Sequence, residues 1–339
     1  MIKNISNYSL LHHNTFGVEG RCRRFLEFQS KDELKQLIAS LSADDQPLMI
    51  IGGGSNLLLT QDFNGTVLHS DIKGVEQLAD DDDHVLLRCG SGECWDDVVE
   101  YCVSHQLYGA ENLSLIPGDV GASAVQNIGA YGAEAKDIIY KVEAVHLLTG
   151  EERVFDASEC QYAYRHSIFK EPSHRQWLIT HVVYRLSLHF RPRLDYGNIR
   201  GELERCGISE PTARQLRQCV IDIRREKLPD PEITGNAGSF FMNPVVNRTK
   251  FLELLAQYPR MPYYEVSETE VKIPAGWMID QCGWKGRSLG RAGVHEKQAL
   301  VLVNRGGAEG SEVLLLCQTI IQDVEKRFGI TLHPEVNIV

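Results

Sequence analysis

The segment with the clearest potential for chemistry is residues 235–244, which reads GNAGSFFMNP. It places one hydroxyl, Ser239, and one amide, Asn243, four residues apart in the chain. Glycine and asparagine allow unusual backbone angles, while the two phenylalanines and the proline restrict the chain on the other side. Such a loop can hold polar groups in fixed positions beside a reacting atom. An ordinary turn with a solvated serine explains the segment equally well.

Two glycine-rich passages could hold an anionic, planar ligand. Residues 52–56 (GGGSN) offer consecutive backbone N–H groups without side-chain obstruction, as a pyrophosphate requires. They lack the lysine of a P-loop and the GxGxxG spacing, so a plain glycine turn is nearly as good an interpretation. Residues 116–132 (IPGDVGASAVQNIGAYG) carry small side chains and one charge, which lets backbone approach a flat ring closely. Together the passages suit a cofactor with a diphosphate and a ring; a tightly packed structural loop is the alternative.

Several charged and aromatic residues are candidates for binding a substrate. Tyr164 and Arg165 combine an aromatic ring with a guanidinium that can grip a carboxylate through two hydrogen bonds. Substrate phosphates could be bound by a group of cations, although solvated side chains are the usual alternative: Lys227, Lys272, Lys285 and Arg287. Tyrosines in polar loops are either without a role or act as lids, and those here are Tyr196, Tyr263 and Tyr264.

Composition limits the function classes. A chain of 339 residues with 43% hydrophobic content is expected to form two or three cores. Its net charge of −11, with no basic stripe interleaved with aromatics, argues against nucleic-acid binding. The nine cysteines are scattered without a CxxC pair, so free thiols and no metal site are expected. No signal sequence and no run approaching about 20 apolar residues is visible, which predicts a cytoplasmic protein without a membrane partner.

Hydrophobic periodicity predicts the elements that position these residues. We expect amphipathic helices at residues 31–40, 95–103, 212–227 and 311–328. Strands are expected at 47–51 and 84–89, within a β-rich stretch from 138 to 188, and at 330–339. The last strand would carry Glu335, although a carboxylate there is usually solvated. Residues 228–231 (LPDP) are predicted to be a hinge between domains.

Together with residues 14–17 (NTFG), 275–282 (AGWMIDQC) and 295–301 (HEKQALV), these motifs resemble the UDP-N-acetylenolpyruvoylglucosamine reductase family. The resemblance runs in order from Asn14 to the last strand. It implies an α+β fold: a two-lobed FAD-binding region of the vanillyl-alcohol-oxidase (PCMH) type plus an α+β substrate-binding domain. The implied boundaries are residues 1–68 for the first lobe, with strand 329–339 returning to it, 69–227 for the second lobe, and 228–328 for the substrate domain.

The resemblance also implies a reaction. A flavin reduced by NADPH delivers hydride to the terminal carbon of UDP-N-acetylglucosamine enolpyruvate, which becomes UDP-N-acetylmuramate for peptidoglycan. Arg165 and Glu335 are implied to stabilise the enolate, and Ser239 to donate the proton. A serine can do so only within reach of the reacting carbon and in a polarising network. Glu335 beside a substrate carboxylate would need a raised pKa or a shared proton.

The positions implied to hold FAD are Gly52, Gly53, Gly54, Ser55, Asn56, Ile116, Pro117, Gly118, Gly121, Ala122, Ser123, Asn127, Ile128, Gly129 and Tyr131. The positions implied to contact the substrate are Tyr164, Tyr196, Lys227, Asn243, Tyr264, Lys285 and Gln298. No histidine stands in either glycine passage, which fits non-covalent FAD. Tyr196 and the tyrosine pair resemble the longer subclass of the family, in which a tyrosine closes over the nucleotide sugar. A monomer is expected.

Two other functions remain open from the sequence. An oxidase with the same FAD fold would use oxygen on a hydroxylated substrate, but it would not need the Ser239 and Glu335 motifs. A flavin- or nucleotide-sugar-binding protein without turnover would not need Arg165, Ser239 and Glu335 together.

Overall fold

The computed structural model describes residues 2–339, which form two compact units. The first unit consists of residues 2–8, Cys22–Gly53 and Asn64–Glu226, and the second of Ser9–Arg21, Gly54–Phe63 and Lys227–Val339. The boundary between the units therefore divides the glycine passage 52–56 between Gly53 and Gly54.

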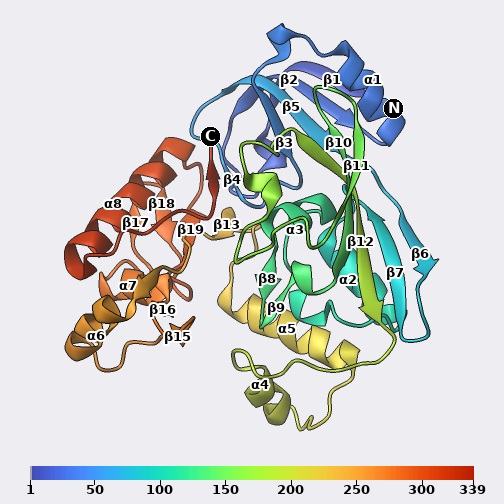
Figure 1. The fold of residues 1–339 in the computed structure, drawn as a ribbon. Helices are drawn as coiled ribbons and strands as arrows, with labels where there is room; N and C mark the ends of the chain where they lie inside the picture. The colour runs from blue at the N-terminus through green and yellow to red at the C-terminus, as the bar shows by residue number, and fades with distance from the viewer. Residues whose placement is uncertain (1) are drawn as a thin grey trace. The chain divides into compact units, whose positions relative to one another are not determined.

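The first unit is built on two sheets (Figure 1). A four-stranded sheet has the order β1-β2-β5-β3, with β3 and β5 parallel, and a five-stranded antiparallel sheet has the order β11-β10-β12-β7-β6. The strands are β1 (Lys3–Ser9), β2 (Arg21–Phe28), β3 (Leu48–Ile51), β5 (Phe63–Ser70), β6 (Val75–Ala79), β7 (His84–Gly90), β10 (Ile139–His146), β11 (Glu152–Asp156) and β12 (Trp177–Ser187), with a separate pair β8 (Gly129–Ala130) and β9 (Ala133–Glu134). The helices are α1 (Lys31–Ser40), α2 (Trp95–Ser104), α3 (Val120–Gln126), α4 (Ile199–Arg205) and α5 (Ala213–Lys227).

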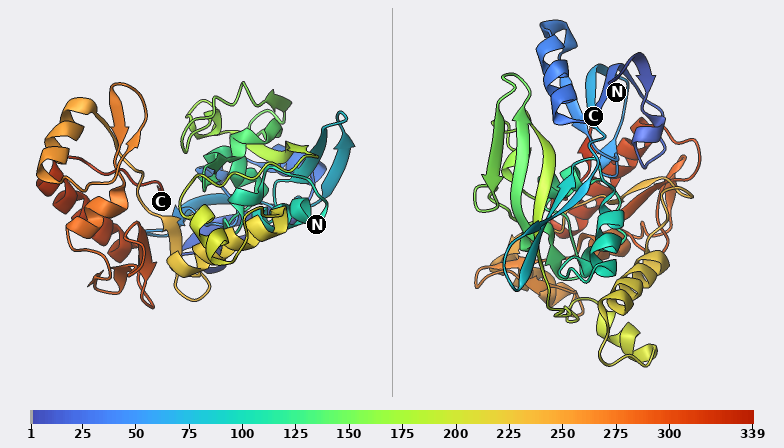
Figure 2. Two further views of the ribbon diagram at one scale, coloured as in Figure 1. Left: turned by 90° about the horizontal axis from the view of Figure 1, so that it is seen from below. Right: turned by 90° about the vertical axis from the view of Figure 1, so that its right-hand side faces the viewer.

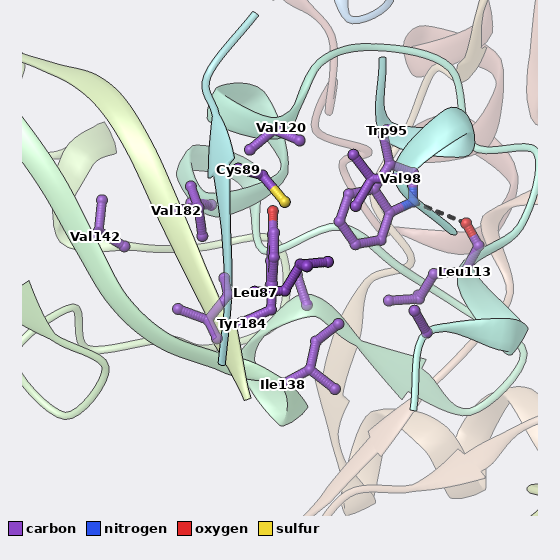
Figure 3. Packing of buried hydrophobic residues seen from close by; sticks show 14 of the residues in the cluster. Leu87, Cys89, Trp95, Val98, Leu113, Val120, Ile138, Val142, Val182 and Tyr184 are labelled. Atoms are coloured by element: carbon purple, nitrogen blue, oxygen red, sulfur yellow. Dashed lines mark hydrogen bonds between the residues drawn. The ribbon is translucent and has the colours of Figure 1, made fainter. Parts of the chain in front are cut away.

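One hydrophobic core fixes α2 and α3 against the five-stranded sheet. Trp95, Val98, Val99, Cys102 and Val103 are buried along one face of α2, as their spacing predicts. Figure 3 shows Trp95 and Val120, which begin α2 and α3, packed in one cluster with side chains of β7 and β12. The indole N–H of Trp95 donates to the Leu113 carbonyl over 2.9 Å, so this large buried ring leaves no polar atom without a partner. The start of α3 is therefore held rigidly.

Helix α5 is attached to α2 by a buried cation, Arg217. Figure 2 shows the ribbon of the molecule in two further views. The Arg217 guanidinium donates to both oxygens of Asp96, over 2.7 and 3.1 Å, and to Glu100 over 2.6 Å. Burial by itself raises the pKa of Asp96, but hydrogen bonds from Arg217 and the Leu115 N–H outweigh it, and the pKa is lowered. The two helices are joined by a charge-assisted contact as well as by packing.

The second unit contains smaller sheets, a long helix and two shorter ones. Its strands are β4 (Leu57–Leu58), β13 (Asn236–Ser239), β14 (Val245–Asn247), β15 (Tyr264–Glu265), β16 (Glu270–Lys272), β17 (Ser288–Leu289), β18 (Ala292–Val294), β19 (Val301–Asn304) and β20 (Asn337–Ile338). Its helices are α6 (Arg248–Gln257), α7 (Ala275–Gln281) and α8 (Gly310–Phe328). The sheet orders are β13-β19-β18-β17 and β14-β16-β15, and β20 pairs in parallel with β4. Gly329 ends α8 in the left-handed conformation, which glycine adopts without a Cβ penalty.

The predicted helices are confirmed, but two predictions about local structure are wrong, and the second glycine passage contains a helix that was not predicted. Residues 330–339 contain only the two-residue strand β20, because the chain before it makes an isolated bridge at Pro334, which has no N–H for a ladder. The passage 116–132 is not all loop, since Val120 and Ala124 bury one side of α3. Ser239 ends strand β13 and so does not lie in an open loop. None of the helices in residues 2–339 is both long enough and apolar enough to cross a membrane.

Candidate active site

The two glycine-rich passages meet in the first unit. A Cβ on Gly53 would lie 3.3 Å from the Gly118 Cα, and one on Gly52 would lie 3.6 Å from the Ala122 Cβ. Gly121 in turn lies against Ser91, where an added Cβ would meet the Ser91 Cβ at 3.0 Å. The two passages therefore approach each other closely at this point, and larger side chains at these positions would fill the space.

The remainder of the first glycine passage lies in the second unit and is fixed there by close contacts. Gly54 has φ +65°, and a Cβ at this position would lie 1.9 Å from the His13 carbonyl oxygen. Its own carbonyl accepts a hydrogen bond from the Thr15 N–H over 3.2 Å. The Asn56 side chain donates to the Glu335 carbonyl over 3.2 Å, and the Asn337 N–H donates to the Asn56 carbonyl over 3.1 Å. The passage is thus tied to the segment that carries Glu335.

Two residues predicted to bind the cofactor turn their side chains into the protein. The Ser123 hydroxyl donates to the Val120 carbonyl over 2.6 Å and lies 2.8 Å from the Tyr184 hydroxyl. Asn127 is fully buried in the left-handed conformation that ends α3, and its amide donates to the Ala163 carbonyl over 2.8 Å. Both side chains brace the second passage, so any contact they make with a cofactor would come from their backbone.

Arg165 is held by a shaped turn. It has φ +54°, a conformation that a non-glycine residue seldom adopts, and its guanidinium donates to the Gly129 carbonyl over 2.8 Å. Lys170 donates to the Arg165 carbonyl and to the Gln126 side chain, each over 3.0 Å. The guanidinium carbon lies 5.4 Å from the centre of the Tyr164 ring. These contacts position Arg165 beside the end of the second glycine passage.

Tyr196 lies at the same passage. A Cβ on Gly132 would be 3.0 Å from the Tyr196 Cβ, and one on Gly197 would be 3.7 Å from the ring of Tyr131. Tyr196 is nevertheless 47% exposed. The loop that carries Tyr196 therefore contacts the glycine passage, while the tyrosine side chain is partly exposed to solvent. A tyrosine in this setting could act as a lid.

Ser239 and the segment of Glu335 meet in the second unit. The Glu335 N–H donates to the Phe240 carbonyl over 2.8 Å, and the Met242 N–H donates to the His333 carbonyl over 2.9 Å. Ser239 itself pairs with Val301 of β19. Phe240 and Phe241 are buried, so the residues that flank the hydroxyl are anchored in the core. The structure thus brings together the segments that carry two predicted catalytic residues, Ser239 and Glu335, which are far apart in the sequence.

The predicted substrate-binding residues of the second unit have different settings. Asn243 accepts the Ala275 N–H at the start of α7 over 2.9 Å, and Gln298 accepts the Leu300 N–H over 3.2 Å. Both amides are therefore oriented by the protein. Lys285 is exposed and lies 3.9 Å from Asp280, and Lys227 is exposed at the end of α5.

Two further residues lie at these positions: Lys272, which was a candidate cation for the substrate phosphates but not one of the positions implied by the family resemblance, and Asp119, which was not predicted to bind anything. Lys272 is opposite Tyr264 in the β15–β16 pair, and its ammonium is 5.8 Å from the centre of that ring. The alternating residue pattern of the two segments that form β15 and β16 could have favoured Lys272 over Lys285 as a substrate-binding residue. Asp119 is the one charge within the second glycine passage, and its carboxylate oxygens lie 3.1 Å from where Cβ atoms on Gly52 and Gly53 would stand. Its position as the one charged residue in that passage was the sequence signal that could have identified Asp119.

Other features of the described residues lie apart from these groups. An open pocket of about 480 Å³ in the second unit is lined by residues that include Phe16, Ile233 and Arg305, and none of the predicted catalytic residues lines it. Asp80, Asp81 and His84 form an exposed cluster with metal-ligand spacing, but Arg185 already donates to both carboxylates over 2.6 Å. Neither feature bears on the catalytic residues.

Comparison with known proteins identifies matching families over most of the chain. Residues 23–157 match an FAD binding domain, and residues 230–339 match the C-terminal domain of UDP-N-acetylenolpyruvoylglucosamine reductase. The reductase of Bacteroides fragilis (strain YCH46) is 56% identical over 98% of this chain and 99% of its own. That of Porphyromonas gingivalis (strain W83) is 50% identical over 98% of each chain. The crystal structure of the Thermus caldophilus reductase covers 100% of this chain and 98% of its own, with a TM-score of 0.66 and 23% identity, and so supports the fold.

Proposed function

This chain belongs to the UDP-N-acetylenolpyruvoylglucosamine reductase family, and from that membership we propose how its own residues carry out the reaction. The protein is a flavoenzyme oxidoreductase, UDP-N-acetylmuramate dehydrogenase, which uses FAD and NADPH in peptidoglycan precursor synthesis. Its fold is an FAD-binding domain of the PCMH type followed by the C-terminal domain of the family.

The glycine passages fit the cofactor. Gly52 and Gly53 lie so close to Gly118 and Ala122 that a Cβ would fill the space, and backbone N–H groups next to small residues are what a diphosphate requires. We assign the FAD site to residues 52–56 and to the second passage from Ile116 to Tyr131. FAD is bound there without a covalent link. When bound, FAD would supply the redox chemistry that connects NADPH oxidation to reduction of the enolpyruvyl group at its terminal carbon.

Three side chains act on the substrate in this proposal. Arg165 binds the substrate carboxylate and stabilises the enolate charge that develops there. Glu335 polarises the same system. The Ser239 hydroxyl then gives its proton to the carbon that bears the carboxylate, and solvent restores that proton. The observation that supports this arrangement most is the hydrogen bond from the Glu335 N–H to the Phe240 carbonyl, which keeps Glu335 next in space to the residue that follows Ser239.

The nucleotide sugar is bound by the remaining candidates. Tyr264 and Lys272 face each other across β15 and β16, which suits a base or sugar on the ring and a phosphate on the ammonium. Oriented amides at Asn243 and Gln298 suit polar groups of the sugar. Tyr164, Lys227 and Lys285 complete the proposed set. Tyr196 closes over the bound nucleotide, as in the longer subclass of the family.

The organisation of the protein follows the same proposal. The first FAD lobe is residues 1–68 with 329–339, the second is 69–227, and the substrate domain is 228–328. In this proposal the parallel pairing of β20 with β4, both of which lie in the second compact unit, joins the last segment to residues 57–58 of the first lobe. We further propose a cytoplasmic monomer.

Anaerobic reoxidation of the flavin tests these roles. The wild type should be bleached by NADPH and should regain its absorbance when UDP-N-acetylglucosamine enolpyruvate is added. Ser239→Ala should still be bleached, but substrate should reoxidise it about 10³-fold more slowly, since a positioned general acid contributes on that order. The control is Ser173→Ala, an exposed loop serine, which should match the wild type.

The same experiment separates the alternatives. Flavin that stays reduced until air is admitted would favour an oxidase. Normal reoxidation of Ser239→Ala by substrate would remove Ser239 as the proton donor while leaving the reaction intact.

A further inference from the structure

Asp119 stands on the backbone groups that the cofactor diphosphate would use. Its Oδ2 lies 3.1 Å from the position of a Cβ on Gly52, and its Oδ1 lies 3.1 Å from that on Gly53. Its carboxylate also accepts a hydrogen bond from the Gly53 N–H. The first glycine passage is therefore fitted to this side chain as well as to the backbone of the second passage.

The carboxylate has none of the usual structural roles of an aspartate at a helix start. Asp119 is the N-cap residue of α3, yet its side chain makes no capping hydrogen bond to that helix. Within residues 2–339 no ion pair to this carboxylate is formed, and Lys73, whose charge lowers its pKa, is instead paired with Asp71 over 3.4 Å and donates to the Gly92 carbonyl. The side chain does not cap its helix and lies instead beside Gly52 and Gly53 of the first glycine passage.

Its charge is weakly compensated. Burial raises the pKa of Asp119 to about 6, although the attraction of Lys73 and the hydrogen bond from Gly53 oppose that rise, and repulsion from Asp71 adds to it. Lys73 and Asp71 are the charged groups that face the carboxylate, since neither the 52–56 passage nor α3 carries a charged side chain. A further negative charge at the same N–H groups would favour the neutral acid.

We propose that the Asp119 carboxylate and the FAD diphosphate are alternative anions at the Gly53 N–H, so that FAD binds with uptake of a proton by Asp119. The inference rests on the proposed FAD site. The neutral acid can stay beside the diphosphate and donate a hydrogen bond to it, whereas the carboxylate would repel it. FAD affinity should accordingly be full at acidic pH and fall as pH rises above about 6, by at most roughly tenfold per pH unit for one coupled proton.

The test is calorimetric titration of the full-length apoprotein with FAD at pH 7.5, in phosphate and in Tris, whose ionisation enthalpies differ. The dependence of the observed enthalpy on the buffer gives the protons taken up, and we expect about one for the wild type. Asp119→Asn keeps the shape and removes the charge, so it should take up none and should bind FAD more tightly at pH 8. Asp82→Asn, which makes the same charge change in an exposed turn, should behave as the wild type.

Lys73→Met provides a second measurement that does not depend on changing the carboxylate. Loss of the facing cation should shift the pH midpoint of FAD affinity upward. Equal enthalpies in both buffers for the wild type, or the same proton uptake in Asp119→Asn, would overturn the inference while leaving the FAD site in place. A wild type that binds no FAD at any pH would refute the site itself and the inference with it.

Discussion

At the scale of single residues, the proposed FAD site contains glycines that are required for different reasons. Gly52 and Gly53 are small because other atoms lie close by, and their backbone angles are ordinary. Glycine is required at position 54 for two reasons: its φ is +65°, and a Cβ would overlap the His13 carbonyl. Gly150 has a similar φ of +69° but open space around it. A side chain at Gly150 would therefore cause backbone strain alone, whereas one at Gly54 would cause both strain and steric overlap.

We therefore expect Gly54→Ala and Gly150→Ala to differ sharply. Gly150→Ala should lower the free energy of unfolding by about 1 kcal/mol, the cost of a left-handed alanine. Gly54→Ala must also move the backbone at His13, and should cost roughly 3 kcal/mol or more and release FAD. Urea unfolding midpoints and the ratio of flavin to protein absorbance measure both effects. Equal losses in the two variants would show that overlap at His13 has no part.

At the scale of elements, buried polar contacts hold the helices that carry the site. Lys170 joins α3, through Gln126, to the turn of Arg165, and Arg217 joins α5 to α2. Because the start of α2 and the start of α3 share one core, a loosened α5 would disturb the neighbourhood of the glycine passages. Helix attachment and cofactor binding are thus linked within the first unit.

Removal of Arg217 should be costly. Arg217→Met leaves Asp96 partly buried without its partner, which should lower the free energy of unfolding by about 3 kcal/mol. Arg214→Met, an exposed change on the same helix, should have little effect. The lowered pKa of Asp96 means that its contribution is present above its unfolded pKa and is lost as pH falls through the lower, folded value. Chemical unfolding measured from pH 7 to pH 3 should show this acid loss in the wild type and a weaker one in Arg217→Met.

At the scale of the whole molecule, cofactor and fold stabilise each other. The first glycine passage begins in one unit and ends in the other, and its two halves are held by different partners. A ligand that binds only the folded passage stabilises the folded protein by mass action. The protein should therefore be measurably less stable without FAD.

Calorimetric scans should show this dependence. Adding FAD at 100 times its Kd should contribute about 2.7 kcal/mol and raise the Tm by roughly 5 °C. FMN lacks the adenylate half and the diphosphate, so at the same concentration it should raise the Tm much less. If FMN and FAD gave the same shift, the glycine passages would have no role in binding a diphosphate.

The sequence by itself determined the local elements and the family. Helices α1, α2 and α8 follow from apolar spacing, because one face of each must be buried, and Gly329 marks the end of α8 by its freedom to adopt positive φ. The long motifs were sufficient for the resemblance that the comparisons confirm. Such signals lie within a few residues of one another and need no partner from elsewhere in the chain.

Only the tertiary structure decided which of these motifs meet. The isolated bridge at Phe241 and Pro334 and the hydrogen bond from Glu335 to Phe240 replace the closing strand that alternation predicts. The turn of Arg165 and the direction of the Asp119 side chain likewise depend on Gly129 and Gly53, which are distant in sequence. Backbone N–H and C=O groups pair with whatever the fold brings near, and local residue preference carries no record of that partner.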